Sequence, residues 1–176
     1  MPRREQREFE DRLAEHRGIV FTLANVYCPA GEERDDLVQE ICLQLWRSFP
    51  RYDRERRFST WMYRVALNTA ISFARSARTR EKRMVPLEQS PDAALAATPP
   101  PRGVDERIAE LHRFLHGLAE LDRALVVLYL EDRSFREIAE ILGISETNVG
   151  TKLSRLKLMM RRELAANDKE AKDGAG

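Results

Sequence analysis

The chain has 176 residues, of which 43% are hydrophobic and 34% are charged. This length allows one domain of ordinary size or two small ones with packed cores. The 30 Lys and Arg residues nearly cancel the 29 Asp and Glu residues, so the overall charge predicts no polyanionic partner. No apolar run is long enough to span a membrane, and the N-terminus, MPRREQREFEDR, is not a signal peptide. These features predict a cytoplasmic protein without membrane insertion.

The distribution of charge is more informative than its sum. Between Asp53 and Arg83 there are nine basic and three acidic residues, whereas between Met84 and Asp122 there are three basic and seven acidic residues. A basic stripe is therefore followed by an acidic segment. We predict from the sequence that the protein binds no cofactor. No set of nucleophile, base and metal ligands is present, and the two cysteines stand alone, as reduced thiols do.

Helical periodicity predicts three helices in the first half of the chain, over about 5–27, 32–48 and 59–80. The first has inward-facing residues at Phe9, Leu13, Val20 and either Leu23 or Ala24. The second carries an apolar stripe at offsets of four, made by Leu37, Ile41, Leu45 and Phe49. No stretch alternates like a strand for long enough, so the sequence predicts an all-α fold.

Two polar patterns lie on these helices. The segment DDLVQE places Asp36, Gln39 and Glu40 opposite the apolar stripe, which suits either a basic protein partner or ordinary solubilising charge. The segment RFSTWMYRVALNTA then places Phe58 and Trp61 among arginines. Rings beside cations bind single-stranded bases and phosphates. The alternative is that these two rings belong to the core, and we expect that at least one of them does.

A Pro-rich segment separates two helical halves. Pro99, Pro100 and Pro101 cannot lie inside a helix and stiffen an extended spacer. We assign 1–83 to a first small domain, 84–104 to a flexible linker, 105–165 to a second small domain and 166–176 to a disordered tail. Helices are predicted in the second domain over about 105–118, 122–131, 134–142 and 145–164.

The last two predicted helices form a helix-turn-helix. Ile138, Ala139 and Leu142 share one face of the first, Gly143 suits its left-handed C-cap, and Ser145 suits the N-cap of the second. The second helix returns to the core through Val149, Leu153, Leu156 and Met160. Its remaining face carries side chains that can bind base edges or phosphates, namely Thr147, Asn148, Thr151, Lys152 and Arg155. We interpret this face as a DNA-contacting one, the alternative being a solvated surface.

Two long segments carry a family resemblance. The block DDLVQEICLQLWRSFPRYDRERRFSTWMYRVALNTAI resembles region 2 of bacterial sigma factors, and LAELDRALVVLYLEDRSFREIAEILGISETNVGTKLSRLK resembles their region 4. The two blocks follow each other with only a short Pro-rich linker between them, as in the extracytoplasmic-function (ECF) subgroup. The resemblance covers about residues 9–164. It implies a factor that binds core RNA polymerase, recognises −10 and −35 promoter elements and aids promoter melting, without catalysing a reaction.

The resemblance also implies roles for individual residues. In the family, the DLxQE helix binds the β′ coiled coil of polymerase, which implicates Asp36, Gln39, Glu40 and, in support, Trp46. The residues implied for the −10 element are Phe58, Thr60, Trp61, Arg64 and Asn68. The −35 element is read by the recognition helix, here through the polar face already described. The implied partners are promoter DNA, the β′ and β subunits of core polymerase and, as in many relatives, an anti-sigma factor.

The sequence departs from the family pattern at two positions. Gly150 stands where many relatives carry a basic residue, and a mid-helix glycine costs about 1 kcal/mol relative to alanine. It either removes a contact or lets the backbone approach DNA closely. Leu67 stands where an arginine is common, so we expect no phosphate contact there.

Two other classes of protein compete with this interpretation. A stand-alone helix-turn-helix regulator explains the second half of the chain but leaves DDLVQE and the aromatic–basic segment without a role. A metal-dependent hydrolase would use His112 and His116, which are four residues apart with Glu110 nearby. No third ligand is placed, so we favour ordinary histidines.

Overall fold

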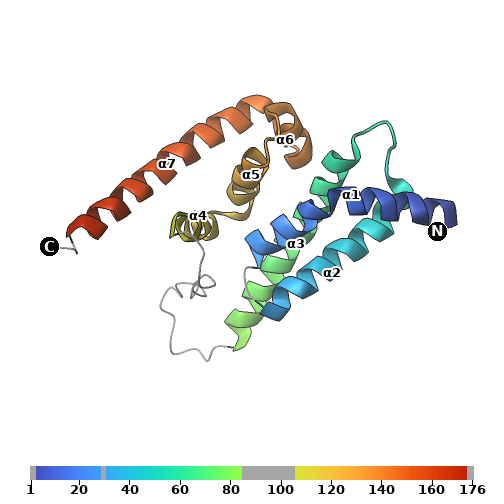
Figure 1. The fold of residues 1–176 in the computed structure, drawn as a ribbon, viewed down its shortest axis with the longest axis horizontal. Helices are drawn as coiled ribbons and strands as arrows, with labels where there is room; N and C mark the ends of the chain where they lie inside the picture. The colour runs from blue at the N-terminus through green and yellow to red at the C-terminus, as the bar shows by residue number, and fades with distance from the viewer. Residues whose placement is uncertain (1–2, 29–30, 85–105, 174–176) are drawn as a thin grey trace. The chain divides into compact units, whose positions relative to one another are not determined.

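The computed structural model describes residues 3–28, 31–84 and 106–173, in which all regular structure is helical (Figure 1). The chain divides into two compact units, Met1–Pro100 and Pro101–Gly176. The division falls inside the predicted linker, whose residues from 85 onward lie outside the described residues. The predicted all-α fold with two small helical domains is confirmed.

The first unit contains α1 (Arg3–Tyr27), α2 (Gly31–Ser48), a 3-10 turn η1 (Phe49–Arg51) and α3 (Phe58–Met84). The three α-helices pack against one another (Figure 1). The apolar stripe predicted on α2 is fully buried, because residues four apart lie on one side of a helix. Helix α3 packs against α2 and contributes Met62, Ala66, Leu67 and Ala70 to the same core. Leu67 is buried in this core, away from solvent.

Aromatic rings fill the end of this core where α2 leads into α3. The ring of Phe49 is fully buried, and its neighbours are the rings of Phe9, Tyr52, Phe58 and Trp61, with centroids at 5.2, 5.9, 6.3 and 6.1 Å. Such pairs each contribute about 0.5–1.5 kcal/mol beyond their buried area. The cluster therefore fixes the loop 52–57 and the first turn of α3 against α1.

The second unit contains α4 (Glu106–Gly117), α5 (Glu120–Leu130), α6 (Phe135–Leu142) and α7 (Glu146–Asp173). Its core is mainly aliphatic and includes Leu125, Leu128, Ile138, Val149, Leu153 and Leu156, all 3% exposed or less. The predicted inward residues of the last helix are thus confirmed up to Leu156, while Met160 is half-buried.

A buried arginine joins the first two helices of this unit. Arg123 is 2% exposed, and its guanidinium donates to the backbone carbonyls of Leu115 (2.8 Å), His116 (2.9 Å) and Leu118 (3.3 Å). Carbonyls at the end of a helix have no partner within it and carry partial negative charge. Arg123 therefore caps the C-terminal end of α4 and fixes the start of α5.

The turn of the helix-turn-helix has the predicted position and caps. Gly143 takes a left-handed conformation (φ 69°) at the end of α6, and the Ser145 hydroxyl accepts from the backbone N–H of Asn148 (3.2 Å). A second cap was not predicted. Ser134 and Glu137 form a capping box at the start of α6, each side chain accepting from the other residue's backbone N–H. The S-x-x-E spacing carries this signal.

The last helix is longer than predicted. The sequence pattern ended it near residue 164 and assigned 166–176 to a disordered tail, but α7 continues to Asp173. The tail prediction is therefore wrong for 166–173. The apolar periodicity stops near 164, but Ala, Glu and Lys in the following segment favour helix, and the first glycine is Gly174. Residues 174–176 lie outside the described residues.

Candidate nucleic-acid interfaces

The outer face of α2 carries the predicted acidic and amide residues. Asp36 and Gln39 are exposed, and Glu40 is half-buried at the side nearer α3, where it accepts from Gln44 Nε2 (2.8 Å). Trp46 is also half-buried, and its ring meets the Phe9 ring edge-on at 5.3 Å. The first three residues share one side of α2, because they are three and four residues apart, whereas Trp46 contacts α1.

The predicted −10 residues on α3 divide into an exposed pair and a buried set. Arg64 and Asn68, one helical turn apart, are exposed. Phe58 and Thr60 are 5% and 7% exposed, and Trp61 is half-buried with its ring 5.0 Å from that of Tyr52. Phe58 thus belongs to the core, as we expected of at least one of the two rings. Only Trp61 can offer part of a ring to a ligand.

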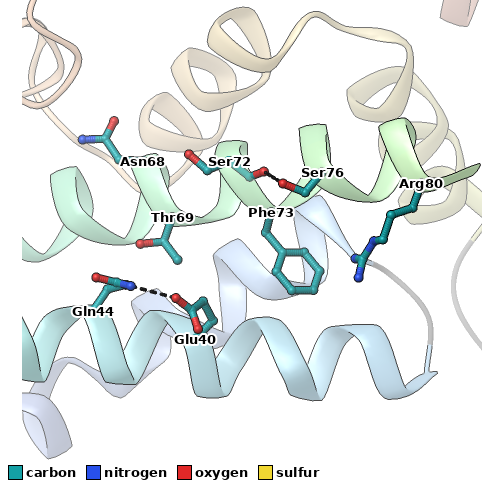
Figure 2. Close-up of a pocket in the computed structure, with 8 residues that line it drawn as sticks. All are labelled: Glu40, Gln44, Asn68, Thr69, Ser72, Phe73, Ser76 and Arg80. Atoms are coloured by element: carbon teal, nitrogen blue, oxygen red, sulfur yellow. Dashed lines mark hydrogen bonds between the residues drawn. The ribbon is translucent and has the colours of Figure 1, made fainter. Parts of the chain in front are cut away.

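A shallow groove of about 560 Å³ runs between α2 and α3 (Figure 2). Glu40 and Gln44 line it from α2, and Asn68, Thr69, Ser72, Phe73, Ser76 and Arg80 line it from α3. Figure 2 shows the Phe73 ring between the two helices, with Arg80 beyond it. The sequence placed Glu40 and Asn68 in different sites, but the structure brings them to one groove. The sequence analysis did not select Thr69, Ser72, Phe73 and Ser76, because their pattern alone resembles ordinary helix surface.

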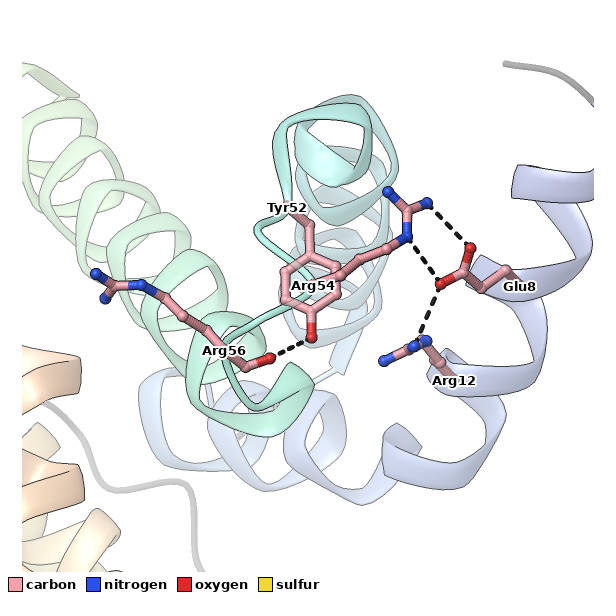
Figure 3. A network of polar contacts seen from close by, with 5 residues as sticks. All are labelled: Glu8, Arg12, Tyr52, Arg54 and Arg56. Carbon is pink, nitrogen blue, oxygen red and sulfur yellow. Dashed lines mark hydrogen bonds and ion pairs between the residues drawn. The ribbon is translucent and has the colours of Figure 1, made fainter.

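The loop 52–57 is held by contacts with α1 that the sequence did not indicate (Figure 3). Glu8 accepts from Arg54 Nε (3.3 Å) and Nη2 (3.0 Å), and it also pairs with Arg12 (3.2 Å). The hydrogen bonds from Arg54 hold the pKa of the Glu8 carboxyl below its ordinary value. Tyr52 donates from its hydroxyl to the Arg56 carbonyl, which closes the loop. Glu8 and Arg54 are 46 residues apart, so no local motif could reveal the pair.

The polar face of α7 is largely exposed. Thr147, Asn148, Thr151 and Arg155 lie on the surface, and the Thr151 hydroxyl donates to the Thr147 carbonyl (3.0 Å). Lys152 lies at the side of this face, toward α5, with 28% of its side chain exposed. The structure therefore brings the five predicted −35 residues together on one helix.

An acidic residue on α5, which the sequence analysis did not select, pairs with two of these five. The Asp122 carboxylate binds Lys152 Nζ through Oδ1 (2.9 Å) and Arg155 Nη2 through Oδ2 (3.0 Å). Lys157, further round the helix, lies over the Tyr129 ring with Nζ 4.0 Å from its centroid, and donates to the Tyr129 hydroxyl (2.9 Å). Both contacts attach α7 to α5.

Gly150 faces the neighbouring helix α6. A Cβ built on this residue would lie 3.6 Å from Cε2 of the Phe135 ring, an ordinary van der Waals distance. The position therefore has room for a methyl group and is turned toward Phe135. This placement does not support the close approach of backbone to DNA that the sequence left open.

The described residues include neither a metal-binding group nor a membrane-spanning helix. No group of three or more His, Cys, Asp and Glu residues is placed there to hold a metal ion. The Cys42 thiol is half-buried, and burial raises its pKa above the ordinary value. None of the described helices combines the length and apolar character that crossing a membrane requires.

Comparisons with known proteins identify both units. The family model for Sigma-70 region 2 matches residues 13–80, and that for Sigma-70 region 4 matches residues 108–160. The ECF RNA polymerase sigma factor SigE of Mycolicibacterium smegmatis is 30% identical over 173 residues, which cover 95% of this chain and 65% of SigE. The ECF RNA polymerase sigma-E factor of Haemophilus influenzae is 30% identical over 139 residues, which cover 73% of each chain.

The fold agrees with these relatives. The sigma factor RpoE of Bartonella quintana, solved with the anti-sigma factor NepR, superimposes with a TM-score of 0.69 at 16% identity, over 90% of this chain and 97% of that one. Two sigma-70 regions in this order define a sigma factor of RNA polymerase, which directs transcription initiation. The chain belongs to the ECF sigma factors. A stand-alone helix-turn-helix regulator is not favoured, because the region 2 match accounts for the first unit.

Proposed function

We propose that this sigma factor binds core RNA polymerase through the outer face of α2, opens and reads the −10 element with α3, and reads the −35 element with α7. One observation carries the proposal. In each unit, a helix whose other side fills the core presents polar side chains to solvent at the positions where the family makes its contacts. The role is one of binding, with no catalytic step and no cofactor.

The polymerase contact rests on the surface made by Asp36, Gln39 and Glu40. Two of these side chains are exposed, and all three can accept hydrogen bonds, so they suit a basic partner such as the β′ coiled coil. Trp46 contributes by keeping α2 in place against Phe9. Region 4 is proposed to contact the β subunit.

The −10 contact rests on Arg64 and Asn68, which are exposed one turn apart on α3. An asparagine offers one acceptor and two donors, enough to read the edge of an extruded base, while an arginine binds phosphate. Trp61 offers a partly exposed ring for stacking. Phe58 and Thr60 are buried, so their proposed role is to hold Trp61 and the start of α3 in place.

The −35 contact rests on the exposed face of α7. Arg155 can donate two parallel hydrogen bonds to guanine. Asn148 can donate one hydrogen bond to N7 of adenine and accept another from its N6 amino group. Thr147 and Thr151 have hydroxyls that can reach phosphates or bases, and Lys152 supplies positive charge at the edge. We place this activity in the cytoplasm, at the nucleoid. By analogy with the RpoE–NepR complex, we also propose an anti-sigma factor as a regulatory partner.

A triple substitution tests the polymerase interface. Asp36→Ala, Gln39→Ala and Glu40→Ala together are expected to abolish co-purification with core polymerase. Exposed positions usually change stability by less than about 0.5 kcal/mol each, so the melting temperature should change little. The matched control is the double variant Asp11→Ala and Glu15→Ala, which removes exposed acids from α1 and should bind normally. Normal recovery of core polymerase by the triple variant would show that α2 is not the interface.

A further inference from the structure

A single carboxylate in the second unit ties together two cations of the recognition face. Asp122 binds Lys152 at 2.9 Å and Arg155 at 3.0 Å, one through each carboxylate oxygen. The Asp122 side chain is only 16% exposed, whereas that of Arg155 is 59% exposed. The acid is therefore recessed between α5 and α7, and the arginine reaches past it toward solvent.

The backbone that carries this acid is held firmly. Asp122 lies in the first turn of α5, where a negative charge is favoured by the helix dipole. The next residue, Arg123, is buried and bound to three carbonyls of α4 and the following turn. Since its neighbour cannot shift without breaking these bonds, Asp122 is a fixed anchor for side chains on α7.

Anchoring affects what Arg155 can do. Its guanidinium has five N–H donors, and Asp122 engages Nη2 on one side only. The remaining donors are free to form the two parallel hydrogen bonds that read a guanine. A guanidinium already held in one orientation loses less conformational freedom when it binds, which favours the one base that fits that orientation.

The same carboxylate has an opposite effect on binding that does not depend on sequence. Lys152 and Arg155 share one negative charge, so the pair attracts phosphates less strongly than two unpaired cations would. Removal of the charge should raise affinity for any DNA while it releases Arg155 from its orientation.

We propose that Asp122 is a positioning residue for promoter recognition. It orients Arg155 through an ion pair that it shares with Lys152. As a result, affinity for DNA of any sequence falls, while discrimination between bases rises. The proposal rests on the function proposed above for α7. It makes Asp122, which lies outside the recognition helix, a determinant of specificity. A residue with only a structural role would instead lower binding to all DNA when it is replaced.

The test uses the full chain reconstituted with core polymerase, on promoters with the preferred upstream element or with one substituted base pair in it. Such an element is first obtained by selection from a randomised library with the wild-type protein. Asp122→Asn is expected to raise affinity for the substituted promoter and to steepen the salt dependence by about one phosphate contact. Preference for the selected base should fall about fivefold, toward that of Arg155→Ala.

Asp132→Asn is the matched control. It removes an exposed acid just beyond the other end of α5, at a positive φ (54°) that asparagine tolerates. Its affinity, salt dependence and preference should match the wild type. In the double variant Asp122→Asn with Arg155→Ala, preference should equal that of Arg155→Ala alone, because the acid acts through the arginine.

The outcomes separate this inference from the proposed function. If Asp122→Asn keeps wild-type preference, or weakens binding to both promoters equally, the positioning role is overturned. Should the variant not fold, as judged by its melting curve, Asp122→Ala replaces it, because alanine also removes the charge and favours the helix. Unchanged preference in that variant then overturns the inference. If Arg155→Ala itself keeps full preference, the failure lies in the function proposed for α7.

Discussion

The two units of this sigma factor support their proposed DNA faces in different ways. In the first, the exposed pair Arg64 and Asn68 stands on a helix whose start is fixed by a cluster of aromatic rings. In the second, the recognition face is fixed from the side by the ion pairs of Asp122. We therefore expect region 2 to respond mainly to the loss of rings, and region 4 to respond to changes in charge and salt.

In the first unit, ion pairs hold a loop and do not involve the proposed DNA face. Glu8, Arg12 and Arg54 join α1 to the loop 52–57 (Figure 3). Arg64 forms no ion pair with any residue in the described ranges. Charge in this unit thus fixes a loop and leaves the proposed DNA face with its cation available. In the second unit, the same kind of contact restrains the cations that are proposed to bind DNA.

The largest expected effect is on stability, and it separates the two cores. Phe49→Ala should destabilise the first unit by about 3–5 kcal/mol, because the fully buried ring touches four others. Both tryptophans of the chain, Trp46 and Trp61, lie in this unit, so their fluorescence reports its unfolding alone. Urea titration followed by fluorescence should show the shift.

Leu125→Ala is the counterpart in the second unit, where the side chain is fully buried. It should cost about 2–5 kcal/mol and shift the circular dichroism transition while the fluorescence transition stays in place. A shift of the fluorescence transition in Leu125→Ala would show that the two units unfold as one.

The next effect concerns base recognition in region 4. Arg155→Ala should cost about 1–3 kcal/mol at one upstream base pair and relax the preference there. Lys157→Ala should weaken binding to all sequences alike, because Lys157 rests on Tyr129 beside the exposed face. Competition binding of the reconstituted holoenzyme to upstream variants measures both. Equal losses on every sequence for both variants would contradict the division of roles.

A smaller effect is expected in region 2. Asn68→Ala should lose base preference at one −10 position, with a cost of about 0.5–1.5 kcal/mol for the hydrogen bonding removed, and should keep normal polymerase binding. Permanganate reactivity of unpaired thymines in the holoenzyme, on promoters that differ at each −10 position, measures opening. Unchanged base preference would refute base reading by Asn68. A lowered melting temperature with equal effects on all promoters would show a role within the domain instead.

The smallest effect is stabilising. Gly150→Ala should raise the stability of the second unit by about 1 kcal/mol, because alanine favours the helix and its methyl group meets Phe135 at an ordinary distance. Gly18→Ala on α1, where a Cβ meets nothing within 4 Å, is the matched change in the first unit. Thermal melts measure both. A loss of upstream recognition in Gly150→Ala would show that the backbone at this position does approach DNA.

The sequence predicted the helices well because each carries its own periodicity. The stripe from Leu37 to Phe49 and the glycine at 143 are local signals, and the structure confirms both. Contacts between distant segments were not predictable in this way. Asp122 meets Lys152 across 30 residues, and the contact depends on how α5 and α7 pack, which neither helix encodes alone.

The candidate site shows the same limit at the level of single residues. Family resemblance grouped Phe58, Thr60 and Trp61 with Asn68, but a motif does not say which way a side chain turns. The structure buries the first two and leaves Asn68 exposed. Similarly, the sequence could not show that Gly150 is turned toward Phe135.

Selection from a promoter library, with and without core polymerase, tests the proposed DNA-binding roles of both units. With core polymerase, the account predicts two conserved elements at a fixed spacing. Arg155→Ala should relax only the upstream element and Asn68→Ala only the downstream one. The chain alone should select neither element strongly, because we propose that core polymerase sets the separation of the two DNA faces. Strong selection of a single element by the chain alone, unchanged when polymerase is added, would contradict the account.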